Sequence, residues 1–121
     1  MQLLSRLQLI FLLAVYLYLG TIKISDSMAA SMNDLLAHCL GYIILMCSGF
    51  FAFPARSYTT KLFILFFLFS FLVECIQYFL PYRSFSLLDL LANGVGLILG
   101  VGMGWLLLPA WKQIRGESRV R

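Results

Sequence analysis

The sequence predicts an all-α fold, a four-helix transmembrane bundle with both termini in the cytoplasm. Three observations support this prediction: 62% of the 121 residues are hydrophobic, only 12% are charged, and the apolar residues form long runs. Soluble domains usually have roughly 25% charged residues, and a soluble chain of this length buries only part of its surface. Lipid must therefore cover this chain, which excludes a cytosolic enzyme, a secreted disulfide scaffold and a free nucleic-acid binder.

Four apolar runs predict one membrane domain, residues 1–121, with helices at about 3–22, 34–53, 61–80 and 87–108. Each run approaches the ~20 residues that a helix needs to cross a bilayer. The first run reaches this length if Leu3 and Leu4 join it while Arg6 extends toward the headgroups. No run alternates like a strand, and short polar breaks separate the runs at 23–27, 54–57 and 81–84.

The first run has an alternative interpretation as a cleavable signal peptide, because small residues follow it at 27–31. The run is long for a signal peptide and contains Tyr16 and Tyr18. Lys23 also separates it from the small residues. We therefore favour a first membrane helix.

The placement of Lys and Arg predicts the orientation. If the amino terminus is cytoplasmic, only Lys23 and Arg83 lie outside, and the other basic residues lie inside: Arg6, Arg56, Lys61, Lys112, Arg115, Arg119 and Arg121. Cytoplasmic segments of membrane proteins are enriched in Lys and Arg, so we place both termini inside and read 112–121 as a basic cytoplasmic tail. The net charge of +4 is then mainly a topology signal, with some attraction to anionic lipid.

Polar side chains within the predicted spans converge near the outer membrane boundary. Three of the helices and one loop supply them at helical spacing: Asp34, His38 and Tyr42; Glu74 and Gln77; Asp89 and Asn93; and Arg83 in the last loop. At ~1.5 Å rise per residue, five of them lie within about 10 Å of the boundary: His38, Glu74, Gln77, Asp89 and Asn93. The inner halves of the helices have almost no polar residues, so these groups form one layer.

The free-energy cost of placing charged groups in a membrane makes this layer a candidate site. A charge at the centre of a membrane helix costs ~2.5–3.5 kcal/mol on insertion scales, so intramembrane ionisable residues are usually functional. Glu74 is the deepest carboxylate and must be protonated, paired or facing a wet cavity. Structural interpretations stay open beside this one. Ser31 with Asp34, and Ser86 with Asp89, match capping boxes at helix starts; His38, Tyr42 and Asn93 are also compatible with packing or interhelical hydrogen bonding.

The last predicted helix has small residues every four positions, at Ala92, Gly96, Gly100 and Gly104. This pattern lets helices approach closely, either within the chain or between two copies in a homo-oligomer. The cysteines Cys39, Cys47 and Cys75 have no metal-ligand spacing and read as small buried residues. We expect no cofactor and no resident metal; the alternative metal set would be Asp34, His38 and Glu74.

The ordered polar set resembles the VanZ-like family of bacterial membrane proteins, over about 34–104. The matching elements are Asp34-xxx-His38-xxx-Tyr42, then Glu74-xx-Gln77-xxx-Pro81-x-Arg83, then Asp89-xxx-Asn93-xx-Gly96-xxx-Gly100. Leu35 stands where many family members have Lys, so a role that needs that cation is not expected here. The family is named after a protein linked to glycopeptide resistance, chiefly to teicoplanin, which makes such resistance an implication of the resemblance.

Our first hypothesis is a protein of the bacterial cytoplasmic membrane with an outward-facing polar pocket for the headgroup of an amphiphile. The amphiphile would be a membrane lipid, a lipid-linked envelope intermediate or a lipid-tailed glycopeptide. Arg83 would hold a phosphate or carboxylate, and Glu74 and His38 would form an acid–base pair if the protein is an enzyme. The remaining ligand-binding residues would be Asp34, Tyr42, Gln77, Asp89 and Asn93. The alternative is a non-catalytic envelope assembly subunit whose polar layer is structural.

Overall fold

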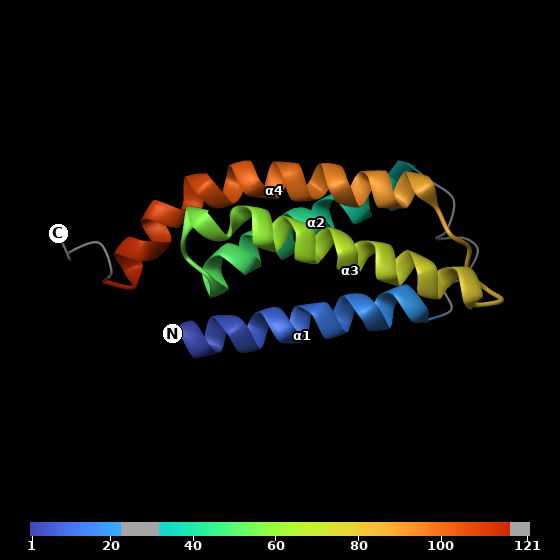
Figure 1. Ribbon diagram of the computed structural model, residues 1–121, viewed down its shortest axis with the longest axis horizontal. Coiled ribbons are helices and arrows are strands. Elements are labelled where there is room, and N and C mark those ends of the chain that lie inside the picture. The colour runs from blue at the N-terminus through green and yellow to red at the C-terminus, as the bar shows by residue number, and fades with distance from the viewer. Residues whose placement is uncertain (23–31, 117–121) are drawn as a thin grey trace.

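A computed structural model of the chain describes residues 1–22 and 32–116. It contains the helices α1 (Gln2–Thr21), α2 (Met32–Ala52), α3 (Thr59–Phe79) and α4 (Leu87–Ile114), with a short 3₁₀ turn, η2 (Arg56–Tyr58), before α3. The helices lie side by side in an up-and-down bundle (Figure 1). All four helices are long and apolar enough to cross a membrane, and the described residues include no strand. The predicted all-α, four-helix fold is confirmed.

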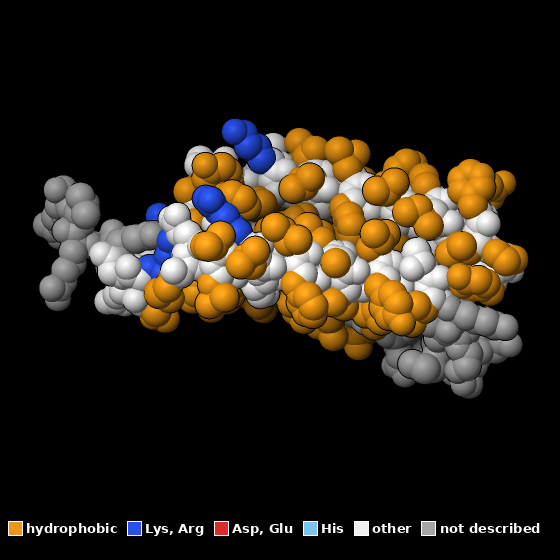
Figure 2. All heavy atoms as spheres, turned by 90° about the horizontal axis from the view of Figure 1, so that it is seen from below, with side chains coloured by type: hydrophobic (Ala, Val, Ile, Leu, Met, Phe, Trp, Pro, Cys, Tyr) orange, Lys and Arg blue, Asp and Glu red, His pale blue; other side chains and the backbone are white. Residues whose placement is uncertain are grey.

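The two ends of the bundle differ in charge. α1 begins and α4 ends at one end, which we call the terminal end; at the other, the pocket end, α1 and α3 end and α2 and α4 begin (Figure 1). Among the described residues, every Lys and Arg except Arg83 belongs to the terminal end, whereas Asp34, Glu74 and Asp89 belong to the pocket end. Figure 2 shows hydrophobic side chains along the helices and basic ones near the terminal end.

The predicted bounds of the first three helices agree with the structure to within two residues, but α4 continues to Ile114 instead of stopping near 108. Pro109 lies inside the helix, where its missing N–H and its ring favour a bend rather than an end, and the last part of α4 turns away from the bundle (Figure 1). Trp111 stabilises this extension: its indole N–H donates to the Phe51 carbonyl at 3.2 Å, and the two rings lie 4.8 Å apart. The start of the predicted basic tail, Lys112 to Ile114, is therefore helical.

α1 packs as a regular member of the bundle. The Tyr16 hydroxyl donates to the Gly41 carbonyl at 2.6 Å, and the Ser48 hydroxyl donates to Gln8 at 2.9 Å. These contacts fit a membrane helix. The small residues at 27–31 that suggested a cleavage site lie outside the described residues.

The small residues of α4 face α2 of the same chain. A Cβ added at Gly96 would collide with the Cys39 carbonyl, and one at Gly104 would collide with the Phe50 ring. Gly100 is similarly close to Met46. The stripe is therefore covered within the chain, and a homo-oligomer, which remains a prediction, would have to use another face.

Substituting Gly96 by Ala should destabilise the bundle because the new methyl group meets backbone atoms of α2, which cannot rotate away. Overpacking of this kind costs about 1–3 kcal/mol of unfolding free energy. Gly102 in the same helix is the matched control, since a Cβ there has no described atom within 4 Å. Gly102→Ala should be neutral or slightly stabilising. Unfolding in detergent measures both variants, and equal stability would contradict this close packing.

Candidate functional site

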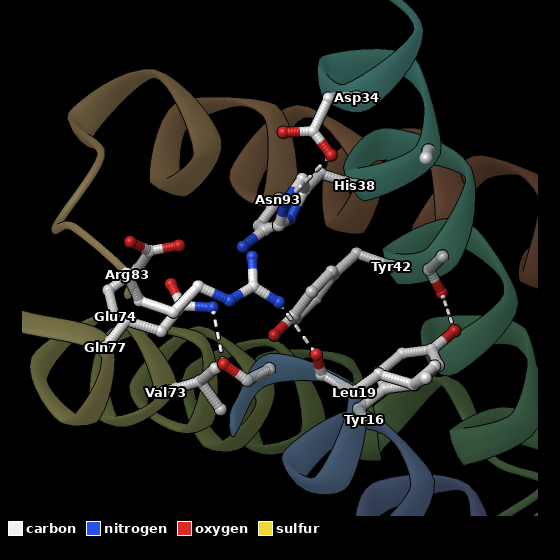
Figure 3. A pocket seen from close by; sticks show the side chains of 13 residues that line it. Tyr16, Leu19, Asp34, His38, Tyr42, Val73, Glu74, Gln77, Arg83 and Asn93 are labelled. Carbon is white, nitrogen blue, oxygen red and sulfur yellow. Dashed lines mark hydrogen bonds and ion pairs between the residues drawn. The ribbon is translucent and has the colours of Figure 1, made fainter. Parts of the chain in front are cut away.

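A polar pocket lies at the pocket end, between all four helices, with a cavity of about 220 Å³. One ordered water needs only about 10–15 Å³, so the cavity has room for a small polar group. It brings together seven of the eight predicted site residues: Asp34, His38, Tyr42, Glu74, Gln77, Arg83 and Asn93. The eighth, Asp89, contacts His38 from α4. Figure 3 shows the labelled side chains around the cavity.

Glu74 connects α3 to the start of α4. Its side chain is only 1% exposed, and its Oε2 accepts the backbone N–H of Ser86 at 3.0 Å. Ser86 is the N-cap of α4, and its hydroxyl accepts the Asp89 N–H at 3.2 Å. Half of the predicted capping box is therefore present. In a full box the Asp89 carboxylate would take the Ser86 N–H, but Glu74 takes it instead.

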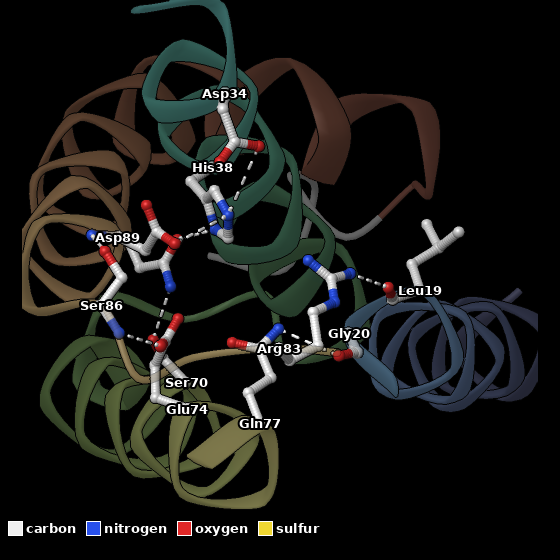
Figure 4. Close-up of polar contacts among 11 residues, drawn as sticks. Leu19, Gly20, Asp34, His38, Ser70, Glu74, Gln77, Arg83, Ser86 and Asp89 are labelled. Atoms are coloured by element: carbon white, nitrogen blue, oxygen red, sulfur yellow. Dashed lines mark hydrogen bonds and ion pairs between the residues drawn. The ribbon is translucent and has the colours of Figure 1, made fainter. Parts of the chain in front are cut away.

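The Asp89 carboxylate faces His38 (Figure 4). His38 Nε2 lies 3.7 Å from Asp89 Oδ2 and 3.9 Å from Asp34 Oδ1. We call Asp34, His38 and Asp89 the Asp–His–Asp triad. Asp34 lies in the first turn of α2. The sequence also predicted a capping box between Asp34 and Ser31, but Ser31 lies outside the described residues. The alternative metal set of the sequence analysis included Glu74, whereas the structure places Asp89 in that position.

The other nitrogen of His38 belongs to a buried hydrogen-bond chain. Nδ1 lies 3.0 Å from Asn93 Oδ1, and Asn93 Nδ2 donates to the Ser70 hydroxyl at 2.8 Å. Asn93 is 2% exposed and Ser70 is fully buried. The chain joins α2, α4 and α3 and fixes the orientation of the imidazole. Ser70 was not predicted, although it lies four residues before Glu74 on the same face of α3.

α1 also contributes to the pocket, which the sequence analysis did not foresee. The last carbonyls of a helix have no partner within it, and here three side chains supply one. Gln77 Nε2 donates to Gly20 at 3.0 Å, the Tyr82 hydroxyl donates to Thr21 at 2.8 Å, and Arg83 Nη2 donates to Leu19 at 2.9 Å. The positive charge of Arg83 also suits the negative end of the helix dipole.

Arg83 has hydrogen-bonding capacity left after this contact. Its side chain reaches into the pocket (Figure 3), and its buried Nε has no hydrogen-bond partner among the described residues. A guanidinium offers five N–H donors in a planar fork that matches phosphate and carboxylate. Arg83 is therefore both a cap for α1 and a candidate anion contact.

Aromatic side chains form the inner wall of the pocket. Tyr42 is 6% exposed, and its ring centroid lies 5.9 Å from that of Tyr16. Tyr16 was noted in the sequence only as an argument against a signal peptide. Its position on α1 gave no indication of the site, because helical spacing within one helix does not say which neighbour that face meets.

The family model described as VanZ/LLP1 matches residues 3–108. The chain belongs to the VanZ/LLP1 family. The match covers all of the predicted site residues and most of α4. No curated protein and no solved structure matches the chain. With its four apolar helices, this VanZ/LLP1 chain is a multi-pass membrane protein.

The buried chain of Asn93 and Ser70 should show energetic coupling. Asn93→Ala removes both hydrogen bonds of the amide and should cost about 1–3 kcal/mol of unfolding free energy. In a double-mutant cycle with Ser70→Ala, we expect a coupling of about 0.5–1.7 kcal/mol. The exposed Ser57 at the terminal end supplies the control, since Ser57→Ala should add to Asn93→Ala without coupling. Strict additivity of the Ser70 pair would contradict the hydrogen bond.

Proposed function

We propose that this VanZ/LLP1 protein binds the polar headgroup of an amphiphile in the pocket at the outer face of the bacterial cytoplasmic membrane. The carrying observation is that the polar side chains of Arg83, Gln77 and Tyr42 line a cavity inside a bundle whose outer surface is apolar (Figure 2). An amphiphile matches both surfaces: its headgroup fits the cavity, and its tail stays beside the helices. A lipid-linked envelope intermediate and a lipid-tailed glycopeptide both have this form.

The proposed orientation rests on charge. Both termini would be cytoplasmic, because the described Lys and Arg side chains lie at the terminal end, with Arg83 as the exception. Basic residues are retained on the cytoplasmic side of membrane proteins. The pocket end would then face the cell envelope, where amphiphilic envelope precursors and glycopeptides are found.

Arg83 is the proposed contact for an anionic headgroup. Its Nε points to no described acceptor, and burial of such a donor without a partner costs about 1–3 kcal/mol. A phosphate or carboxylate oxygen in the cavity would satisfy it. Our proposal concerns binding; the acid–base roles of Glu74 and His38 stay predictions.

A second candidate is a non-catalytic assembly subunit of the envelope. The observation in its favour is that many of the polar side chains bind one another or the backbone: Asn93 with Ser70, Gln77 with Gly20, and Tyr82 with Thr21. In that case the polar layer would only stabilise the bundle. Substitutions would then reduce stability without releasing any particular lipid.

Mass spectrometry of co-purified lipids distinguishes the two candidates. We expect a specific amphiphile with the wild-type protein and its loss in Arg83→Ala. Arg56→Ala, which removes the same charge at the terminal end, should retain it. Thermal unfolding of each variant in the same detergent checks that loss of the α1 cap has not unfolded the bundle. Only bulk lipid in all three folded samples would remove the support for headgroup binding.

Glycopeptide susceptibility tests the site in cells. If the pocket acts on a lipid-tailed glycopeptide, the wild-type protein should raise the teicoplanin concentration that inhibits growth. Glu74→Gln and His38→Ala should each lose most of this increase, because both side chains line the pocket. Ser57→Ala, expressed at the same level, should keep it. An undiminished increase in both pocket variants would exclude these residues from the activity.

A further inference from the structure

The Asp–His–Asp triad encloses a gap that direct contacts do not fill. Each of its residues offers one ligand atom, and these atoms lie within 4.8 Å of one another. The two separations from His38 Nε2, 3.7 and 3.9 Å, exceed the range of about 2.7–3.2 Å for a hydrogen bond. The two ion pairs, drawn as dashed lines in Figure 4, are thus longer than direct hydrogen bonds.

The tautomer of His38 determines what fits this space. Asn93 Nδ2 donates to Ser70, so Asn93 Oδ1 is the atom that accepts from His38 Nδ1. In a neutral imidazole the proton is then on Nδ1, and the lone pair of Nε2 points toward two carboxylates. This arrangement is repulsive unless a proton on Nε2 or a cation lies between the three groups.

Basic side chains of the described chain do not supply that cation. Asp34 and Asp89 form ion pairs only with His38 among the described residues, and Arg83 donates to the Leu19 carbonyl. The triad is also reachable, since the Asp34, His38 and Asp89 side chains are 39%, 26% and 18% exposed. An ion from solution can therefore enter.

We propose that the Asp–His–Asp triad is a binding site for a divalent transition-metal ion, Zn²⁺ or Mn²⁺. Two carboxylate oxygens and one imidazole nitrogen suit these ions better than Mg²⁺ or Ca²⁺, which prefer oxygen alone. Ligand atoms at about 2.1 Å from a metal lie about 3.0–3.4 Å apart. The two separations from His38 would therefore shorten by about 0.3–0.9 Å, and the two carboxylate oxygens, which lie within 4.8 Å of each other, by up to about 1.8 Å. Asn93 completes the arrangement, because metal-binding histidines commonly donate their second N–H to a fixed acceptor.

A metal here would differ from the sequence prediction, which expected none, and would change the electrostatics of the pocket. The two triad carboxylates carry a formal charge of −2, which a divalent ion cancels. Three protein ligands leave coordination positions open, and an oxygen of a bound headgroup can occupy one of them. The metal site does not depend on headgroup binding, so each proposal can fail separately.

Metal titration of the purified full-length protein tests this proposal. A tag without histidine is needed, since the chain has only one His. After removal of metal by a chelator, we expect Zn²⁺ or Mn²⁺ to bind with one ion per chain by calorimetry and elemental analysis. Asp34→Asn and Asp89→Asn, which keep side-chain size, should each weaken binding by at least about 100-fold, and Asn93→Ala by about 10–100-fold.

Two further readouts separate a lost site from a misfolded protein. Ser57→Ala, at the terminal end and outside the pocket, should bind the metal with little change. The metal should raise the unfolding temperature of the wild type and of Ser57→Ala but not of Asp89→Asn. Pulsed paramagnetic resonance of bound Mn²⁺ should detect an imidazole nitrogen that His38→Gln removes.

The proposal is overturned if the folded wild-type protein binds neither ion, or if Asp34→Asn and Asp89→Asn bind as the wild type does. Lipid analysis of the metal-free protein keeps the two proposals distinct. A specific amphiphile with no metal supports headgroup binding alone, and a metal with only bulk lipid supports the metal site alone.

Discussion

The hydrogen bond from the Ser86 N–H to the buried Glu74 carboxylate determines how the pocket end is built. It closes the turn between α3 and α4 and satisfies a backbone donor at the start of a helix, where lipid offers no substitute. It also takes the role that Asp89 would have in a capping box. Asp89 is thereby free to face His38, and a helix-start motif becomes part of a site.

Backbone groups at the end of α1 also need hydrogen-bond partners that lipid cannot supply. Three of its last carbonyls receive side-chain donors from α3 and the following loop, so the backbone requirements of one helix end position Gln77, Tyr82 and Arg83. These side chains then form a wall of the pocket. The same residues therefore stabilise the bundle and line the pocket. A variant of Arg83 has to be tested for thermal stability as well as for ligand binding.

The sequence predicted the fold well because each apolar run had to cross the bilayer as a helix. It also predicted which side chains share a layer, since depth follows directly from position along a helix. It could not predict rotation between helices, and so the alternative metal set contained Glu74 where the structure has Asp89 beside Asp34 and His38. For the same reason Tyr16 and Ser70 were not among the predicted site residues. The end of α4 was misplaced because the apolar run stops near 108, whereas the contact of Trp111 with Phe51 stabilises a further helical segment beyond Pro109.

The pocket has an acidic side and a basic side. Asp34 and Asp89 lie on α2 and α4 around His38, whereas Arg83 lies beside the end of α1. Without a cation on the acidic side, an anionic headgroup at Arg83 would meet repulsion at short range, because electrostatic interactions are weakly screened in a low-dielectric setting. A metal at the triad would remove that repulsion and offer the headgroup a second point of attachment. The two proposals are thus independent in their tests but mutually favourable in their physics, and together they give a role to Asp34 and Asp89, while Glu74 keeps its structural contact with Ser86.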